Sequence, residues 1–125
     1  MKVRLARLAH ARSGDKGDRA DIGLFAFDAP TYRVLEQAVT AERVAAHFAW
    51  LGTTSVDRYP LPNLLAVKFV LNGALSGGAA RSLRSDNLGK TLGGVLLRME
   101  IEIDDAVAAT LPRLQGGGDD DPDLA

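Results

Sequence analysis

The sequence predicts an α+β domain in which helices pack on one face of a small, mainly antiparallel sheet. Three observations support this prediction. The 125 residues, 46% of them hydrophobic, suit a single buried core. Apolar runs with strand character lie near the start of the chain, and segments of helical and of strand periodicity alternate after them. We therefore expect one domain over residues 1–115.

Three apolar segments predict strands in the first half of the chain. The first two, Val3–Ala9 and Ile22–Phe27, contain residues of good strand propensity. The third, Ser55–Tyr59, is closed by Pro60-Leu61-Pro62. Because proline cannot donate to a strand ladder, this segment is not expected to be central at that end.

Helices are expected between and after these strands. Tyr32–Val39 is predicted to be a short helical turn. Thr40 is a suitable N-cap for a helix that ends before Gly52. The dense apolar run Asn63–Leu75 has the length of a buried helix, although Val67–Leu71 alone could be a strand.

The second half is expected to contain shorter elements. Arg81–Arg84 is a candidate short strand. Thr91 could cap a helix that runs to about Leu97, after which the alternation of apolar and charged residues predicts a strand to Ile103. Asp104 or Asp105 could cap a last short helix, which would end near Pro112.

The net charge of −1 conceals an uneven distribution. Four of the 16 acidic residues lie in the last seven positions, so the chain before them carries 12 acidic and 15 basic residues. Residues 116–125 begin with three glycines and are predicted to form a flexible acidic tail. The mildly basic body is compatible with an anionic small molecule, but it is too weakly charged to indicate nucleic acid.

Composition excludes several classes of protein. The chain contains no cysteine, so disulfides, thiolate metal sites and cysteine nucleophiles are absent. No apolar run has the length of a signal-peptide core or of a membrane span. We expect a cytoplasmic protein that has no membrane contact, no bound metal and no cofactor.

The segment Ala11–Gly23 is the strongest functional signal. It holds three glycines, three aspartates and three basic residues between the first two predicted strands. A hairpin turn needs only two to five residues, so this stretch is predicted to be a long charged loop. Polar residues that a turn does not need are typical of a binding or catalytic site.

Two chemical interpretations of this loop use its acidic and basic groups. Its aspartates could hold Mg²⁺ or Ca²⁺, but the alternating spacing of a calcium loop is missing and the neighbouring cations would repel the ion. Alternatively, Asp15 and Lys16 could form an acid–base pair, with His10 titrating near neutral pH. Asp15, His10 and Lys16 are therefore the candidate catalytic residues.

A third interpretation uses the backbone of the same loop and is the best physical match. Gly14 and Gly17 could direct successive N–H groups inward as an anion nest, and Lys16 would add positive charge. The aspartates would then hold the loop by bonding to its own backbone. The candidate ligand-binding residues in this segment are Ser13, Gly14, Asp15, Lys16, Gly17 and Asp18.

Gly89-Lys90-Thr91 resembles the end of a phosphate-binding Walker motif, but Arg84 stands where that motif requires a glycine. A weaker anion site at the start of a helix is still possible there, with Lys90 adding charge. Arg84 is a further candidate ligand, and Arg58, Arg81 and Arg84 could form a cluster that faces an anion if their strands lie beside the loop.

Several segments together resemble the small AtuA-like ferredoxin-fold domain of acyclic-terpene-utilisation proteins. They are Ala9-His10-Ala11-Arg12-Ser13-Gly14-Asp15-Lys16-Gly17-Asp18 with Ala20-Asp21-Ile22-Gly23, Arg58-Tyr59-Pro60-Leu61-Pro62-Asn63-Leu64, Phe69-Val70-Leu71, and Ser82-Leu83-Arg84-Ser85-Asp86 with Gly89-Lys90. The resemblance covers about Val3 to Ile103. At Asp21 and Lys68 the chain departs from the pattern, which has asparagine at both positions.

The resemblance implies a ferredoxin-like fold and a role in the breakdown of branched or isoprenoid acyl groups as coenzyme A thioesters. It supplies no reaction. Three hypotheses therefore remain. The first is an accessory domain that binds an acyl-CoA-like anion or a larger partner, such as an AtuA-type protein or an acyl-CoA carboxylase or hydratase. The second is a small enzyme with Asp15 or His10 as general base, and the third is an oligomerisation module. We also expect a homo-oligomer, because small sheets of this kind leave an edge or face to be covered.

Overall fold

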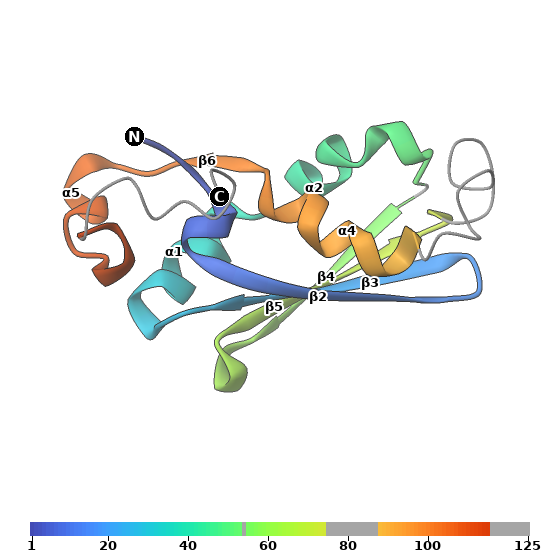
Figure 1. Ribbon diagram of the computed structural model, residues 1–125, viewed down its shortest axis with the longest axis horizontal. Coiled ribbons are helices and arrows are strands. Elements are labelled where there is room, and N and C mark those ends of the chain that lie inside the picture. The colour runs from blue at the N-terminus through green and yellow to red at the C-terminus, as the bar shows by residue number, and fades with distance from the viewer. Residues whose placement is uncertain (54, 75–87, 116–125) are drawn as a thin grey trace.

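The computed structural model describes residues 1–53, 55–74 and 88–115. Its main sheet is antiparallel, with the strand order β2-β3-β5-β4 (Figure 1). The four strands are Ala9–Lys16 (β2), Arg19–Ala26 (β3), Ser55–Leu61 (β4) and Ala66–Asn72 (β5). A smaller antiparallel sheet pairs Lys2–Arg4 (β1) with Glu100–Glu102 (β6).

The helices gather on one side of the main sheet. These are Ala29–Ala38 (α1), Ala41–His47 (α2) and Leu88–Leu97 (α4), and a further short helix, Asp105–Ala108 (α5), follows β6. Figure 1 shows α1, α2 and α4 on the same side as the small sheet. The α+β, ferredoxin-like prediction with helices on one face is confirmed.

A single hydrophobic core fills the space between the helices and the main sheet. The sheet contributes every second residue of its inner strands, such as Ile22, Leu24 and Phe69. The other side contributes Leu96 of α4 and Phe48, which directly follows α2. This burial on one face only is typical of an antiparallel sheet with helices on one side. The described residues contain no helix that is long and apolar enough to cross a membrane.

Local capping signals locate the helix starts well, and two predicted helix ends are wrong. The hydroxyl of Thr40 accepts the Arg43 N–H at 3.1 Å at the start of α2, but α2 ends at His47, and Gly52, with a left-handed φ of 71°, ends the 3₁₀ turn Ala49–Leu51 that follows. Asp104 caps α5 as predicted, but α5 ends at Ala108 and does not reach Pro112. The predicted turn after Pro30 is in fact the ten-residue helix α1, because the Asp28 carboxylate accepts the Thr31 N–H and caps it.

The largest correction concerns the supposed long loop at residues 11–23. Strands β2 and β3 pair without interruption from Ala9 opposite Ala26 to Lys16 opposite Arg19. Only Gly17 and Asp18 connect them, and Gly17 supplies the left-handed φ of 63° that so short a turn requires. The long loop was therefore a wrong prediction, and the extended backbone of Ser13–Lys16 does not form the nest expected there.

The predicted helix Asn63–Leu75 is also wrong. A 3₁₀ turn at Pro62–Leu64 is followed by β5, in which Val67, Phe69 and Leu71 are buried and the residues between them are partly exposed. The sequence hid this alternation because Val70, on the exposed side, is itself apolar. The proline prediction held, since β4 is an edge strand.

Three smaller differences involve the remaining elements. The first predicted strand divides into β1, a 3₁₀ turn at Leu5–Arg7 and the start of β2. Helix α4 begins at Leu88, so Thr91 lies inside the helix and does not cap it, whereas the helix end at Leu97 and the strand after it are confirmed. The predicted strand Arg81–Arg84 and the tail 116–125 lie outside the described residues.

Candidate functional site

The side of the main sheet that faces away from the helices is the candidate site, and we call it the open face. The strand registers place on it the side chains that alternate with the buried ones. Its residues are His10, Arg12 and Gly14 of β2, Arg19, Asp21, Gly23 and Phe25 of β3, Ala66, Lys68, Val70 and Asn72 of β5, and Ser55, Asp57, Tyr59 and Leu61 of β4.

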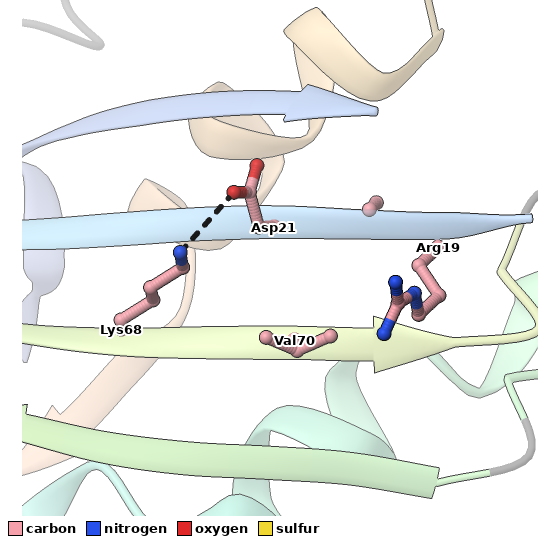
Figure 2. A pocket seen from close by; sticks show the side chains of 5 residues that line it. Arg19, Asp21, Lys68 and Val70 are labelled. Atoms are coloured by element: carbon pink, nitrogen blue, oxygen red, sulfur yellow. Dashed lines mark ion pairs between the residues drawn. The ribbon is translucent and has the colours of Figure 1, made fainter. Parts of the chain in front are cut away.

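An ion pair lies near the middle of the open face. Lys68 Nζ is 3.5 Å from Asp21 Oδ2, and both side chains are partly exposed (Figure 2). The family pattern described above has asparagine at both of these positions. In this chain the two asparagines are replaced by an aspartate and a lysine, which form an ion pair with each other. A hollow of about 180 Å³ adjoins the pair and is lined also by Arg19, Ala20 and Val70.

A second hollow, of about 320 Å³, lies on the other side of the ion pair and shares Asp21 and Lys68 with the first. Small residues line it where the strands run beneath, namely Gly14, Gly23 and Ala66. Its other lining residues include Arg12, Phe25 and Leu61. The open face is therefore hollowed where its residues have small side chains or none, and both charged and apolar groups border the hollow.

Two cations flank this hollow across three strands. Arg12 pairs with Gly23, and Gly23 pairs with Lys68, so the two basic residues lie in one row with a glycine between them. Adjacent strands are about 4.8 Å apart, which places the backbones of Arg12 and Lys68 about 10 Å from each other. An anionic group of the size of a phosphate could contact both side chains.

Aromatic rings form the apolar end of the same face. The His10 and Phe25 rings are stacked, with centroids 5.1 Å apart and an angle of 9° between their planes. The edge of Phe25 lies over Gly23, because a Cβ at residue 23 would come within 2.8 Å of Phe25 Cε2. A side chain at residue 23 would therefore force the Phe25 ring to move from its place beside the hollow.

The residues of the Ala11–Gly23 segment are divided between the two faces of the sheet. Gly14 lines the hollow, and Gly17 and Asp18 form the turn. Ser13 faces the helices, where its Oγ accepts the Gly93 N–H of α4 at 2.9 Å. Its hydroxyl therefore joins a helix to the sheet.

His10 and Asp15, two of the three candidate catalytic residues, do not converge. They are five positions apart in one regular strand, so His10 lies on the open face and Asp15 on the side of the helices. The third candidate, Lys16, pairs with Arg19 at the end of β2. The side chains of Lys16 and Lys90 lie outside the described part of the structure, as does all of Arg84.

Arg58 faces the helices as well, and it does not join the open face. Its Nε donates to the Val39 carbonyl at 3.0 Å, and Nη2 donates to the carbonyl of Glu36. Sequence inspection missed Arg12, Phe25, Leu61 and Lys68 as site residues. The available signal was period-two alternation along all four strands of the main sheet, which places these side chains opposite the core.

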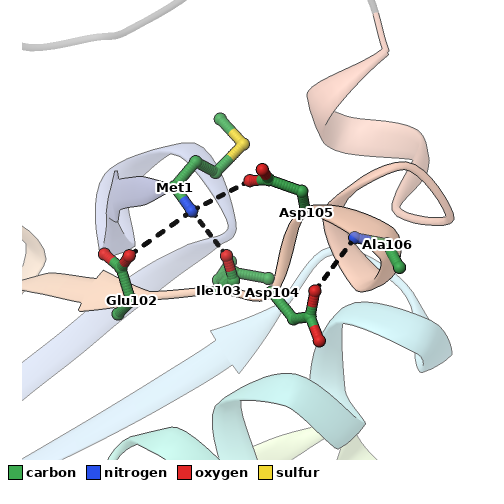
Figure 3. A network of polar contacts seen from close by, with 6 residues as sticks. All are labelled: Met1, Glu102, Ile103, Asp104, Asp105 and Ala106. Atoms are coloured by element: carbon green, nitrogen blue, oxygen red, sulfur yellow. Dashed lines mark hydrogen bonds and ion pairs between the residues drawn. The ribbon is translucent and has the colours of Figure 1, made fainter.

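A second polar cluster joins the start of the chain to the α5 region (Figure 3). The Met1 amino group donates to the Ile103 carbonyl at 2.6 Å and to Asp105 Oδ1 at 3.2 Å, and it lies 3.6 Å from Glu102 Oε1. The hydrogen bond to Asp105, together with the negative charges of Asp105 and Glu102, raises the pKa of the amino group. This cluster lies at the end of the small sheet.

The family model described as "AtuA ferredoxin-like domain" matches residues 3–102. No curated protein and no solved structure matches the chain. The matched range includes every strand of the main sheet and thus the whole open face.

Proposed function

Because the chain belongs to the AtuA ferredoxin-like domain family, we propose that it is an accessory binding domain whose open face takes an anionic acyl compound. The class of ligand is a coenzyme A thioester of a branched or isoprenoid acid, as the family resemblance implies. In this proposal the ligand carries the negative charge, and Arg12 and Lys68 of the sheet carry the positive charge.

The observation that carries the proposal is the hollow bordered by Arg12 and Lys68 on its charged sides and by Phe25 and Leu61 on its apolar sides. A coenzyme A thioester has the same two properties, since phosphate groups and an acyl chain belong to one molecule. Charge-assisted hydrogen bonds to phosphate are among the stronger polar contacts of proteins, and the ring of Phe25 offers apolar surface within the same hollow.

The shape of the site favours binding and presentation over chemistry. Enzyme pockets enclose most of a small ligand, whereas this hollow lies on an uncovered sheet face. A ligand seated on it would keep a large exposed surface. Such a surface could be completed by a larger partner, for which an AtuA-type protein or an acyl-CoA carboxylase or hydratase is the proposed candidate.

The alternative of a small enzyme has less support. General acid–base catalysis needs its groups within hydrogen-bond reach of one substrate. His10 and Asp15 lie on opposite faces of β2, so they cannot act on the same ligand. His10 alone is on the open face, where it is stacked on Phe25.

Calorimetric titration with coenzyme A and a short branched acyl-CoA tests the proposal. A charge-assisted hydrogen bond contributes about 1.5 kcal/mol, so Lys68→Ala and Arg12→Ala should each weaken binding about tenfold. Lys2→Ala is the matched control, because it removes an exposed cation from the small sheet and should leave the affinity unchanged. Absence of binding by the unmodified chain, or equal affinities in all four proteins, would refute the proposal.

A further inference from the structure

Large apolar side chains are exposed on the open face. Leu61 and Tyr59 of β4 are 37% and 49% exposed, and Phe25 lies in the same row across the sheet as Leu61, with Ala66 between them. Exposed apolar patches on a protein surface mark sites of interaction. The places of the large and the small side chains on this face indicate which partner fits it.

Two small side chains of the open face each have a large neighbour on the other side of the line between β3 and β5. Gly23 of β3 pairs with Lys68 of β5, and Ala66 of β5 pairs with Phe25 of β3. A second copy related by a two-fold axis that runs above this line, parallel to the strands, has its β5 above β3 and its β3 above β5. Lys68 of the second copy then lies above Gly23, and Phe25 of the second copy lies above Ala66.

The outer strands of the open face match in the same way. The two-fold axis brings β4 of the second copy above β2, and Asp57 of the second copy above Gly14, because these two residues lie at the ends of one row. Gly14, Gly23 and Ala66 are small residues that line the larger hollow. Packed sheets lie about 10 Å apart with interdigitating side chains, so larger side chains of the second copy would fill this hollow.

The charges at the edges of the open face are complementary between two copies. Arg12 of β2 is exposed, and Tyr59 of the second copy lies above it. Asp57 of the second copy is two residues, or about 7 Å, further along the same strand, which is within reach of the long arginine side chain. Asn72 Nδ2 donates to Asp57 Oδ2 at 2.9 Å and holds this carboxylate in place. The part of the chain that the structure describes gives Arg12 no ion-pair partner of its own, whereas a second copy supplies one, together with a tyrosine ring for a cation–π contact.

The charges at the centre of the open face also alternate in sign between the copies. Lys68 Nζ lies 3.5 Å from Asp21 Oδ2 of its own chain (Figure 2). Asp21 of the second copy comes above β5, two residues along the strand from Lys68. Each lysine then lies between two carboxylates, and each carboxylate lies between two lysines. Complementary charges of this kind fix the orientation of two surfaces and disfavour other partners.

The area of the open face is sufficient for a weak dimer. Its four strands have seven or eight residues each. They cover about 19 by 24 Å, so two copies packed on this face bury about 900 Å² in total, before the relief of the side chains is counted. Specific interfaces that are weak or transient bury less than about 1,200 Å². We therefore expect a dimer that dissociates at micromolar concentrations.

We propose that two copies of this chain pack open face against open face about this two-fold axis. The interface is isologous, because the same side chains meet from both copies. Lys68, Asp57 and Phe25 of the second copy fill the larger hollow, so a ligand in that hollow must displace the second copy. The competition with a ligand rests on the proposed function, but the contact between the copies does not.

Sedimentation velocity of the full chain between about 1 µM and about 1 mM tests this interface. The unmodified chain should change from monomer to dimer over that range. Asp57→Lys places a cation against Arg12 of the second copy and should raise the dissociation constant of the dimer at least about tenfold. Arg12→Glu combined with Asp57→Lys exchanges the two charges and should restore most of the affinity. The control Asp15→Lys makes the same charge change on the other side of the sheet and should have no effect.

Three results of this experiment would refute the interface. The first is an unmodified chain that remains a monomer at every concentration. The second is a dimer that Asp57→Lys and Asp15→Lys weaken equally, because the copies would then meet elsewhere, for example along the edge of β2. The third is a double variant that does not regain the dimer, because Arg12 and Asp57 would then not be in contact.

Titration with coenzyme A separates this inference from the proposed function. Asp57 lies outside the larger hollow, so Asp57→Lys keeps Arg12 and Lys68 for the ligand. A protein concentration above the dissociation constant of the dimer should weaken coenzyme A binding by the unmodified chain about threefold or more and leave that by Asp57→Lys unchanged. A dimer that Asp57→Lys dissociates, with no coenzyme A binding in either protein, would support the interface and refute the ligand proposal. Coenzyme A binding by a chain that is always monomeric would refute the interface alone, and a dimer that binds coenzyme A without dissociating would refute the filled hollow.

Discussion

Replacing Asp21 by asparagine should tighten the binding of an anionic ligand, although it removes a charged residue from the site itself. Asp21 Oδ2 lies 3.5 Å from Lys68 Nζ and competes with any ligand for that cation. It also repels an anion in the hollow that it lines. The asparagine variant keeps the shape of the side chain and removes both effects.

The magnitude follows from the exposure of the pair. The Lys68 and Asp21 side chains are 44% and 39% exposed, so water screens their attraction strongly. Exposed ion pairs contribute about 0.2–1 kcal/mol, which Lys68 would regain for the ligand. A carboxylate about 6 Å from a bound anion adds about 0.7 kcal/mol of repulsion in water. Together these terms, about 0.9–1.7 kcal/mol, predict that Asp21→Asn binds coenzyme A about five- to eighteenfold more tightly.

Isothermal titration calorimetry at low and moderate salt measures this difference. Asp15→Asn removes the same charge from the other side of β2 and should change the affinity little. The gain for Asp21→Asn should shrink as the salt concentration rises, because screening weakens the repulsion. An unchanged or weaker affinity in Asp21→Asn would refute the assignment of Lys68 as a contact of the ligand.

Three further predictions concern the scaffold. Ser13→Ala removes the hydrogen bond to Gly93 and should lower the free energy of unfolding by about 1 kcal/mol in urea titrations; a loss of coenzyme A affinity instead would make Ser13 a ligand contact. Phe69→Ala should lower the free energy of unfolding, measured in urea titrations, by about 3–5 kcal/mol, because that ring is fully buried. Val70→Ala on the open face should lower it by less than about 1 kcal/mol. Similar losses in the two variants would contradict the alternation of buried and exposed residues along β5. Acetylation of the Met1 amino group should destabilise the fold at pH 7. The raised pKa means that the protonated amine stabilises the folded state fully below the ordinary value of 8.0 and loses this effect as the pH rises through the raised value. The difference between the urea midpoints of the two proteins should therefore shrink as the pH is raised from 7, and a difference that does not change with pH would contradict this.

Signals that act over a few residues were readable from the sequence. Thr40 and Asp104 cap the starts of α2 and α5 as predicted, through contacts with residues two to three positions away. Gly52 takes the expected left-handed conformation, but it ends the 3₁₀ turn Ala49–Leu51 and not the helix that Thr40 starts. The edge position of β4 followed from its proline, because the missing N–H is a property of that residue alone.

Features that depend on distant pairing were not readable in this way. The charged residues of β2 form a strand because β3 pairs with them, and β5 is a strand because it lies between β3 and β4. The candidate site has the same origin. Arg12, Gly23 and Lys68 come from three strands, and only the register of the sheet brings them into one row.

The most direct test of the open face as the ligand surface is a map of amide NMR shifts during titration of the full chain with coenzyme A. We predict that the largest changes occur at Arg12, Gly14, Gly23 and Lys68, which line the larger hollow. Changes confined to the Gly17-Asp18 turn or to the start of α4, with the open face unaffected, would contradict the central claim.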